Sequence, residues 1–563
     1  MTLTCYFYFL ICSFSSQEEA MPFRIIEKTK CDVLIIGSGG AGLSASIAAA
    51  ANGSDVLMVS KARIGHASNT YLSKGIIAAS GWGDPEDTGR THCSDTIQGG
   101  RMLNNPAMVA RFTEAIRTET RQIREWGVDY ISDDNSEPAV MKIAGHSFAR
   151  HLVGKDWKGS NIVLPLKEKA RQSGVRFEEH LFVASLMMSE NRVKGASCIS
   201  EDGRFLAISA KAVILATGGF GNLYLNTNNA PGITGDGHAL AGSAGVTLQD
   251  MEFVQYYPTA RGKRGSRLLL NEKLLVQNGV CLRNTRGDDI LKKNGYDVPG
   301  DVTRDQLAQV LIKEIFEDPE QSGSVSFDMS GLSPEAAEDL STLLPSQWTR
   351  GERVFQVAPT THFCMGGVVV DSEGQTSCEG LYAAGEVAAG AHGANRLGGN
   401  ALAEVIAMGS LVGKAAAEKA MGLDRASSFD AAVEDALKGL KALFGKKGLE
   451  PGELVQKLKK VMWQDAGIVR SQESLERALE TVTGLKNTRA FVTSFHQLIR
   501  FLEFRNMRFA GEMVCRSALE RTESRGSHFR SDYPNENNDA WVVNIQIRQT
   551  PDGTVLETVS VPG

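Results

Sequence analysis

The sequence contains no pair of cysteines separated by two residues. Its nine cysteines are scattered over 563 residues. Zinc fingers, iron–sulfur clusters and disulfide-rich folds need closely spaced cysteines. We therefore expect no metal site within this chain and a reducing, intracellular setting.

An excess of charge of one sign is also missing. The chain has 60 basic and 66 acidic residues, and a formal net charge of −6. No general basic field is present to attract nucleic acid or anionic lipid. We expect no nucleic-acid partner, and we expect any anionic ligand to be held by local groups.

Long apolar runs are absent near the N-terminus, where a targeting segment would lie. The one candidate, residues 5–14, is shorter than the roughly 20 residues that span a bilayer and lacks the basic start of a signal peptide. We expect no direct membrane insertion and a cytoplasmic location, with contact to the inner face of a membrane only through partner subunits. Residues 1–20 are interpreted as the product of an upstream start codon, with a functional leader as the alternative.

Proline is scarce and glycine abundant, with 16 and 58 residues. Charged residues make up 22% and hydrophobic residues 42%, which is typical of a globular α/β protein. The length predicts two to four domains. The glycine surplus indicates loops that handle a nucleotide.

A glycine-rich loop lies between an apolar strand predicted at 31–36 and an alanine-rich helix predicted at 42–51. A second apolar run ends at Ser60, and this order is that of a dinucleotide-binding unit. At the end of the second strand, Ser60 and Lys61 stand where many such folds carry a ribose-binding carboxylate, which favours FAD over NAD. The predicted pyrophosphate loop consists of Gly37, Ser38, Gly39, Gly40, Ala41 and Gly42.

Several ordered motifs give the chain a family resemblance. They include ATGGFGNLY at 216–224, TGDGHALAGSAG at 234–245, THFCMGG at 361–367, GLYAAGEVAAGAHGANRLGGNAL at 380–402 and ESRGSHFRSDYP at 523–534. In these the chain resembles the flavoprotein subunits of succinate dehydrogenase and fumarate reductase, a family that also contains L-aspartate oxidase. The resemblance implies an α/β fold: a Rossmann-like FAD-binding domain, an inserted α+β capping domain and a C-terminal helical domain.

The expected domain boundaries follow changes in composition and pattern. They are an N-terminal extension at 1–30, the FAD-binding domain at 31–255 and 356–425, the cap at 256–355, the helical domain at 432–540 and a strand-like tail at 541–563.

The resemblance also implies the residues that contact FAD. Glu386 would bond to the ribityl chain, and Asp236, Asn400 and Leu402 would lie along the flavin and its linker. Where the family often has a histidine that holds FAD covalently, this chain has Asn69, so we predict non-covalent FAD. The remaining predicted contacts are Ser60, Lys61, Thr70, Gly75, Thr217 and Gly218.

A dicarboxylate site needs cations for two carboxylates and a proton donor. His362 and Arg396 match the family's carboxylate-binding positions, and Arg304 matches its proton-shuttling arginine. Without the family, Arg304 in a Thr-Arg-Asp sequence before a helix would be a solvated residue beside an N-cap. We expect Arg304, Glu272, His362 and Arg396 to be catalytic. We also expect the substrate to be contacted by His362 and Arg396 together with Tyr257 and Thr259.

Three positions depart from the family pattern. Tyr257 replaces a substrate-contacting histidine, and Leu275 replaces an arginine of the proton relay. Ile143 stands where L-aspartate oxidase has the glutamate that recognises its amine, and isoleucine cannot pair with ammonium. These differences favour a non-amino dicarboxylate over aspartate.

The resemblance predicts interconversion of a fumarate-like enoate and its saturated dicarboxylate, with hydride transfer at flavin N5. The chain has no electron-carrying cysteine cluster, so an iron–sulfur subunit is the expected partner, with oxygen or a stand-alone reductase as alternatives. L-aspartate oxidase remains the rival enzyme. A flavin-carrying electron-transfer subunit without turnover of a small molecule is the rival from another class.

Overall fold

The computed structural model describes residues 23–562, except 134–136, 263–265, 267, 300–301, 319–322, 342 and 424–429. The side chain of Glu272 also lies outside this description. The interpretation of residues 1–20 as an upstream start concerns residues outside the described part.

A parallel five-stranded sheet forms the centre of the body. Its order is β17 (Leu381–Ala383), β10 (Ala212–Leu215), β2 (Val33–Ile36), β3 (Val56–Val59) and β6 (Arg176–Glu178). The inner strands are short, wholly buried apolar runs, as expected for a sheet that is covered on both faces. This is the predicted dinucleotide-binding architecture.

Helix α1 (Gly40–Ala51) follows β2 directly and packs against the long helix α10 (Asn400–Met421). The two backbones approach closely at two glycines of α10. A Cβ at Gly409 would lie 2.6 Å from the carbonyl oxygen of Ala41, and a Cβ at Gly413 would lie 2.2 Å from that of Ala45. Small residues on both helices therefore allow α1 and α10 to pack closely.

A second sheet extends the body in the order β1 (Ile25–Lys30), β9 (Arg204–Ser209), β8 (Arg192–Ile199) and β7 (Phe182–Ser189). Strand β1 pairs in parallel with β9 along its whole length. The segment expected to be an N-terminal extension therefore contains a strand that belongs to the folded body. The other elements of the body are α2 (Asn69–Leu72), β4 (Ile76–Ala78), α3 (Gly89–Gly99), α4 (Pro106–Glu125), β5 (His151–Val153), α5 (Ser160–Gln172) and α6 (Asp236–Ser243).

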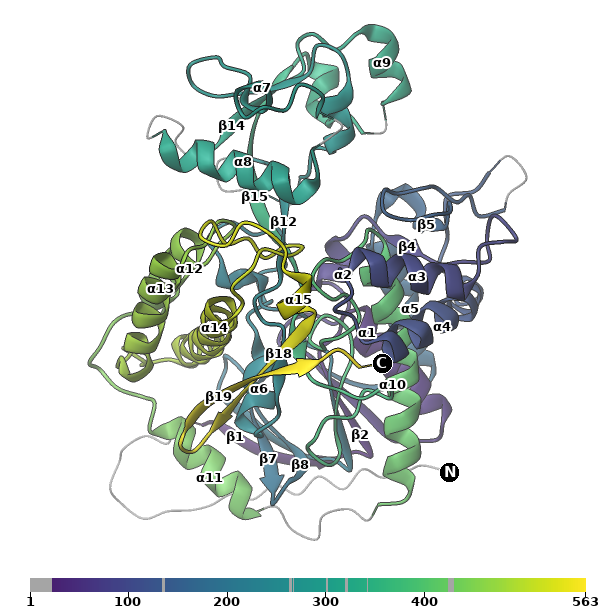
Figure 1. Ribbon diagram of the computed structural model, residues 1–563. Helices are drawn as coiled ribbons and strands as arrows, with labels where there is room; N and C mark the ends of the chain where they lie inside the picture. The colour runs from purple at the N-terminus through teal and green to yellow at the C-terminus, as the bar shows by residue number, and fades with distance from the viewer. Residues whose placement is uncertain are drawn as a thin grey trace.

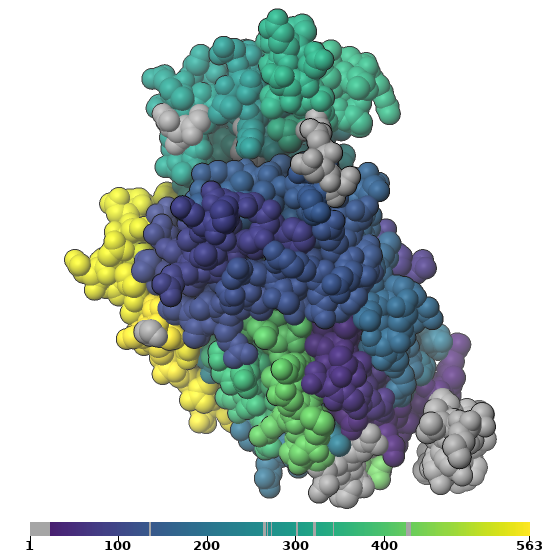
Figure 2. All heavy atoms as spheres, turned by 90° about the vertical axis from the view of Figure 1, so that its right-hand side faces the viewer, coloured from purple at the N-terminus to yellow at the C-terminus, as the bar shows by residue number. Residues whose placement is uncertain are grey.

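Two long antiparallel strands, β12 (Val254–Arg261) and β15 (Val354–Cys364), lead out of the body into the segment predicted to be the cap. This segment stands above the body in both overall views (Figures 1 and 2). It has its own apolar cluster, which runs from Leu270 to Ala358. Its further elements are β13 (Cys281–Arg283), α7 (Ile290–Lys293), α8 (Arg304–Glu317), β14 (Val325–Asp328) and α9 (Pro334–Asp339).

The C-terminal part contains α11 (Asp430–Lys441), α12 (Pro451–Asp465), α13 (Gln472–Gly484) and α14 (Phe495–Glu520). The chain then forms α15 (Asn538–Trp541) and the hairpin of β18 (Val543–Thr550) and β19 (Gly553–Ser560). Strand β18 pairs with β11 (Leu248–Gln249), which also pairs with β16 (Gly367–Val368). The predicted tail is thus a hairpin bound to the body.

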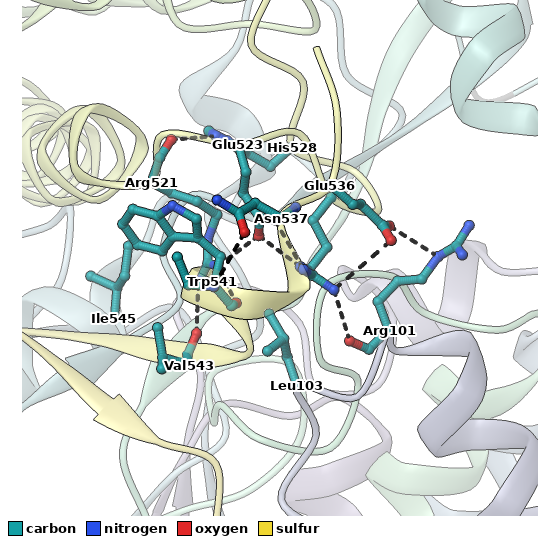
Figure 3. A network of polar contacts seen from close by, with 12 residues as sticks. Arg101, Leu103, Arg521, Glu523, His528, Glu536, Asn537, Trp541, Val543 and Ile545 are labelled. Carbon is teal, nitrogen blue, oxygen red and sulfur yellow. Dashed lines mark hydrogen bonds and ion pairs between the residues drawn. The ribbon is translucent and has the colours of Figure 1, made fainter. Parts of the chain in front are cut away.

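The ESRGSHFRSDYP motif lies in a buried network of charged groups (Figure 3). The guanidinium of Arg521, just before the motif, donates to Glu252 at 2.7 Å and to Glu523 at 3.1 Å. It also donates to the carbonyl oxygens of Trp541 and Val543. Because Glu252 precedes β12, this network ties the C-terminal segment to the base of a strand that carries the cap. Removing one partner from such a pair is strongly destabilising.

Within the part of the chain that the structure describes, no helix is long and apolar enough to cross a bilayer. The same residues include no group of three or more histidine, cysteine, aspartate or glutamate side chains suited to a metal ion.

Candidate active site

A cavity of about 900 Å³ runs from the loop after β2 to the cap. Residues that directly follow β2, β3, β10 and β17 line one end, and residues of the cap line the other. Ligands of open parallel sheets bind at this edge, outside the carboxyl ends of the strands.

The loop after β2 has the shape that a diphosphate requires. Gly37 has a φ of +109°, and a Cβ there would meet the carbonyl oxygen of Ala216 at 2.2 Å. The N-cap of α1 is Gly39, which has no side chain to cap the helix, so the amides that follow Gly40 in the first turn remain for a ligand. The amide of Gly40 donates to Thr70 Oγ1 at 3.0 Å, which fixes α2 beside the loop.

Lys61 occupies the wall beyond β3. Its ammonium donates to Thr234 and Asp236, each at 2.7 Å, and to Glu503 of α14 at 2.9 Å. Burial alone would lower the pKa of Lys61, but the carboxylates of Asp236 and Glu503 raise it above its ordinary value. The side chain therefore stays charged and joins the cavity to the C-terminal helices.

Glu386, in the loop after β17, points into the cavity. Its carboxylate accepts from the amide of Cys364 at 3.1 Å and from Asn69 Nδ2 at 3.2 Å. Burial raises the pKa of Glu386. Asn69 is held in turn by Asn229 at 2.7 Å and by the amide of Ala230 at 2.9 Å.

The structure brings most predicted cofactor residues to the cavity wall but leaves three outside it. Gly42 packs against the carbonyl oxygen of Gly37, and Gly75 lies beside the carbonyl of Lys158. Asn400 is fully buried and bonds to His92 and Thr96. The predicted residues on the wall are Gly37, Ser38, Gly39, Gly40, Ala41, Ser60, Lys61, Asn69, Thr70, Thr217, Gly218, Asp236, Glu386 and Leu402.

Arg396 lies at the cap end of the cavity. Its Nη2 and Nε both donate to Gln255 Oε1, at 2.8 and 3.2 Å, and its guanidinium stacks 4.9 Å from the centre of the Phe363 ring. Burial, together with the charge of Arg304, lowers the pKa of Arg396 to about 10. A buried arginine beside a second one is a strong site for a carboxylate.

His362 lies near the two arginines, and its Nδ1 is 3.0 Å from the side-chain nitrogen Nδ2 of Asn228. Burial and the charges of Arg396 and Arg304 hold the pKa of His362 well below its ordinary value. This shift favours the neutral imidazole, which acts through hydrogen bonds.

Arg304 comes from the cap. Thr303 caps α8: its hydroxyl accepts from the amide of Gln306 at 3.3 Å, and Gln306 Oε1 accepts from the amide of Thr303 at 3.0 Å. This capping box places Arg304 in the first turn, where its side chain lines the cavity. Arg304 thus stands beside an N-cap, as the Thr-Arg-Asp sequence predicts, and its side chain lines the cavity instead of being fully solvated.

Tyr257 lines the cavity with its ring rather than its hydroxyl, which donates to the carbonyl of Leu270 at 3.1 Å. The ring centre lies 5.1 Å from the guanidinium carbon of Arg304. Thr259 donates to the same carbonyl at 2.7 Å and does not line the cavity. Leu275 belongs to the apolar cluster of the cap, and the side chain of Glu272 is outside the described part.

Sequence reasoning missed several residues of the wall. Lys74 and Asn228 had no recognisable signal, whereas Asn271 and Lys273 flank the predicted Glu272 and could have been found there. The cap also contributes three apolar side chains, Leu269, Leu340 and Leu343.

Two family models match the chain. One, described as FAD binding domain, matches residues 32–402, and the other, described as fumarate reductase flavoprotein C-term, matches residues 455–561. The first model covers more than half of the chain.

Similar proteins and structures agree with these models. A fumarate reductase (CoM/CoB) subunit of Methanothermobacter marburgensis is 34% identical, with 93% of this chain and 98% of that protein covered. L-aspartate oxidase of Mycobacterium bovis is 32% identical, with 89% and 92% covered. The structure of E. coli quinol fumarate reductase FrdA matches with a TM-score of 0.85 at 28% identity, covering 95% of this chain and 97% of that one.

The expected resemblance is thus confirmed, and the uncapped helix start, the glycine loop and the buried cavity suit the cofactor of this family. The chain belongs to the FAD-dependent oxidoreductase family of fumarate reductase and succinate dehydrogenase flavoproteins, which includes L-aspartate oxidase, and its cofactor is FAD.

Proposed function

We propose that the chain interconverts a non-amino dicarboxylate and its enoate, in the manner of fumarate and succinate. The convergence of Arg304 from the cap with Arg396 and His362 from the body on one cavity carries this proposal. Bound FAD supplies a hydride acceptor or donor at flavin N5. Gly37–Ala41, Lys61, Asp236 and Glu386 would hold it.

Arg396 binds one carboxylate of the substrate. Gln255 and the face of Phe363 fix the guanidinium plane, so that its free edge can engage a carboxylate with little loss of side-chain entropy. His362, whose lowered pKa favours the neutral imidazole, donates a hydrogen bond to the same end of the substrate.

Arg304 carries the proton. In the reducing direction it protonates the alkene carbon next to the one that receives hydride. The nearness of the two arginines supports this role: the charge of Arg304 contributes to the lowered pKa of Arg396, and this repulsion favours release of a proton from either guanidinium. The cap leucines that line the cavity exclude water from this transfer.

FAD is held without a covalent bond in this proposal, because Asn69 occupies the family's attachment position. Precipitation of the protein with acid should release all of the flavin into the supernatant. A fluorescent protein pellet would contradict it.

The electron partner is proposed to be an iron–sulfur subunit, and the protein would reach the inner face of a membrane through it. Support comes from relatives whose names describe them as subunits of fumarate reductase. Copurification from the native source, followed by iron analysis, tests this proposal.

L-aspartate oxidase is the second candidate because a relative of that name covers most of the chain. Ile143 argues against it. This side chain lines the cavity and would set an apolar group where an ammonium ion needs an anion. Peroxide formation from aspartate by the purified protein would favour this candidate over the first.

The decisive experiment is anaerobic. The bound flavin is reduced, fumarate or iminoaspartate is added, and reoxidation is followed by absorbance. We expect reoxidation by fumarate, and we expect Arg304→Ala to slow it by roughly 10²-fold or more while FAD stays bound. Arg283→Ala is the matched control, because this cap arginine pairs with Asp328 at 3.0 Å and does not line the cavity.

Reoxidation of Arg304→Ala at the wild-type rate would remove Arg304 from the proton transfer. If no enoate reoxidises the reduced flavin, the result would instead favour an electron-transfer subunit without turnover of a small molecule.

A further inference from the structure

A second cavity, of about 600 Å³, lies where three parts of the molecule meet. Its walls come from residues 222–234 of the body, from Ser266 and Leu268 of the cap segment, and from helices α12 and α14. Figure 1 shows these two helices together on one side of the body, below the cap. No step of the proposed reaction uses this cavity.

The second cavity shares a wall with the active-site cavity. Adjacent residues of the same segments face the two sides: Asn228 lines the first cavity and Asn229 the second. Likewise, Leu269 lines the first and Leu268 the second, while Pro231 borders both. One layer of chain therefore separates the two cavities.

Two cations line the second cavity, Lys459 from α12 and Arg500 from α14. Arg500 pairs with Glu503 at 3.1 Å, and Glu503 is also bound by Lys61. Lys459 makes no hydrogen bond or ion pair with any residue that the structure describes. Burial and the charge of Arg500 lower the pKa of Lys459 to about 8. A half-buried ammonium beside a guanidinium is unfavourable unless an anion joins them.

The rest of the wall combines polar and apolar groups. The amides of Asn222 and Asn229 lie on the side of the body, and the buried side chains of Val455 and Met507 lie on the helices. A ligand that suits this wall has an anionic head for the cations and a short apolar part for Val455 and Met507.

We propose that this cavity binds a small organic oxyanion, with a carboxylate or phosphate head, at a site separate from that of the substrate. A molecule bound there would also touch the segment that positions His362, the residue proposed to bond to one end of the substrate. Asn229 Nδ2 donates to the carbonyl oxygen of His362 at 3.3 Å, and the side chain of Asn228 contacts the His362 ring.

The test is calorimetric titration of the FAD-loaded protein with hexanoate and with inorganic phosphate. Each is titrated into wild type, Lys459→Gln and Lys460→Gln. Lys460 is the matched control, because it is exposed on the same helix and does not line the cavity. We expect Lys459→Gln to weaken binding roughly tenfold or more and Lys460→Gln to leave it unchanged. Hexanoate should bind more tightly than phosphate because of the apolar wall.

The same titration in an Arg396→Ala background separates the two cavities. Binding that persists there and is lost on adding Lys459→Gln supports the second site, whether or not the protein turns over a dicarboxylate. Equal binding by the two lysine variants, or binding that Arg396→Ala alone abolishes, overturns the proposal. Absence of binding by both probes to wild type also overturns it. Flavin absorbance and melting temperature verify that each variant is folded, and Lys459→Met serves as a second variant that retains the apolar stem.

Discussion

Buried charge is the main feature of this site at the scale of single residues. Arg396, His362, Glu386 and Lys61 are all largely removed from water, and each is held by a different partner. Burial shifts the pKa of Arg396 and His362 downward and that of Glu386 upward, so their protonation depends on neighbours. The charge of a bound substrate therefore changes the protonation of these groups more than it would at an exposed site.

Glu404 of α10 gives a pH prediction at this scale. Burial, with a contribution from nearby Glu386, raises its pKa to about 8. The folded protein thus holds a proton that the unfolded chain releases near pH 4.5. Stability from this group is present at low pH and falls as pH rises from about 4.5 to 8, by on the order of 5 kcal/mol.

Glu404→Gln should remove this dependence, because the amide is neutral at every pH. The difference in melting temperature between the variant and wild type should grow in favour of the variant from pH 5 to pH 8.5. Parallel melting curves over this range would show that Glu404 is already ionised in the folded protein.

Helix α14 links distant parts of the chain at the scale of secondary structure. Glu503 on this helix bonds to Lys61, although 442 positions separate them. Asn506, one turn further along, donates to Asp236 at 2.9 Å. Helix α14 thus holds Lys61 and Asp236, two side chains that line the FAD cavity.

We predict that Glu503→Gln weakens FAD binding roughly tenfold, because Lys61 loses one of its two carboxylate partners. Glu512→Gln is the control on the same helix, since Glu512 is also buried but pairs with Arg508 and Arg516. Titration of the apoprotein by flavin fluorescence measures both affinities. Similar losses in the two variants would attribute the effect to the helix rather than to Lys61.

The sequence was most informative where structure is local. The apolar strand, the loop from Gly37 and the following helix form one continuous segment, and Thr303 with Gln306 already identifies the start of α8. Lys74 and Asn228 on the cavity wall, and Glu503 behind Lys61, could not be predicted, because tertiary packing brings them there. Asn400, by contrast, lies in a strong motif, yet its side chain turns to His92, since a motif fixes the backbone path more firmly than each contact.

At the scale of the whole molecule, the candidate active site lies between the cap and the body. Arg304 belongs to a cap with its own apolar cluster, while Arg396 belongs to the body. A dicarboxylate that engages both arginines would therefore connect the cap to the body.

Malonate, which has two carboxylates but no reducible bond, tests this connection. We predict that saturating malonate slows amide hydrogen exchange in cap residues 302–317 of wild type by several-fold or more, because closing the cap protects this region. Arg304→Ala should show no such slowing. Equal protection in both proteins would mean that malonate acts through the body alone.

The pairing of β12 with β15 has a further consequence for how the protein can be altered. Because Ala260 lies opposite Ala358 and Arg261 opposite Val357, the chain leaves and re-enters the body at neighbouring positions. The cap is thus a domain insertion whose ends already meet, and a tight turn could replace it without breaking the register below. Caps from other members of the family could be exchanged at the same point, which would change Arg304 and the cap leucines while Ile143, His362 and Arg396 of the body stay in place.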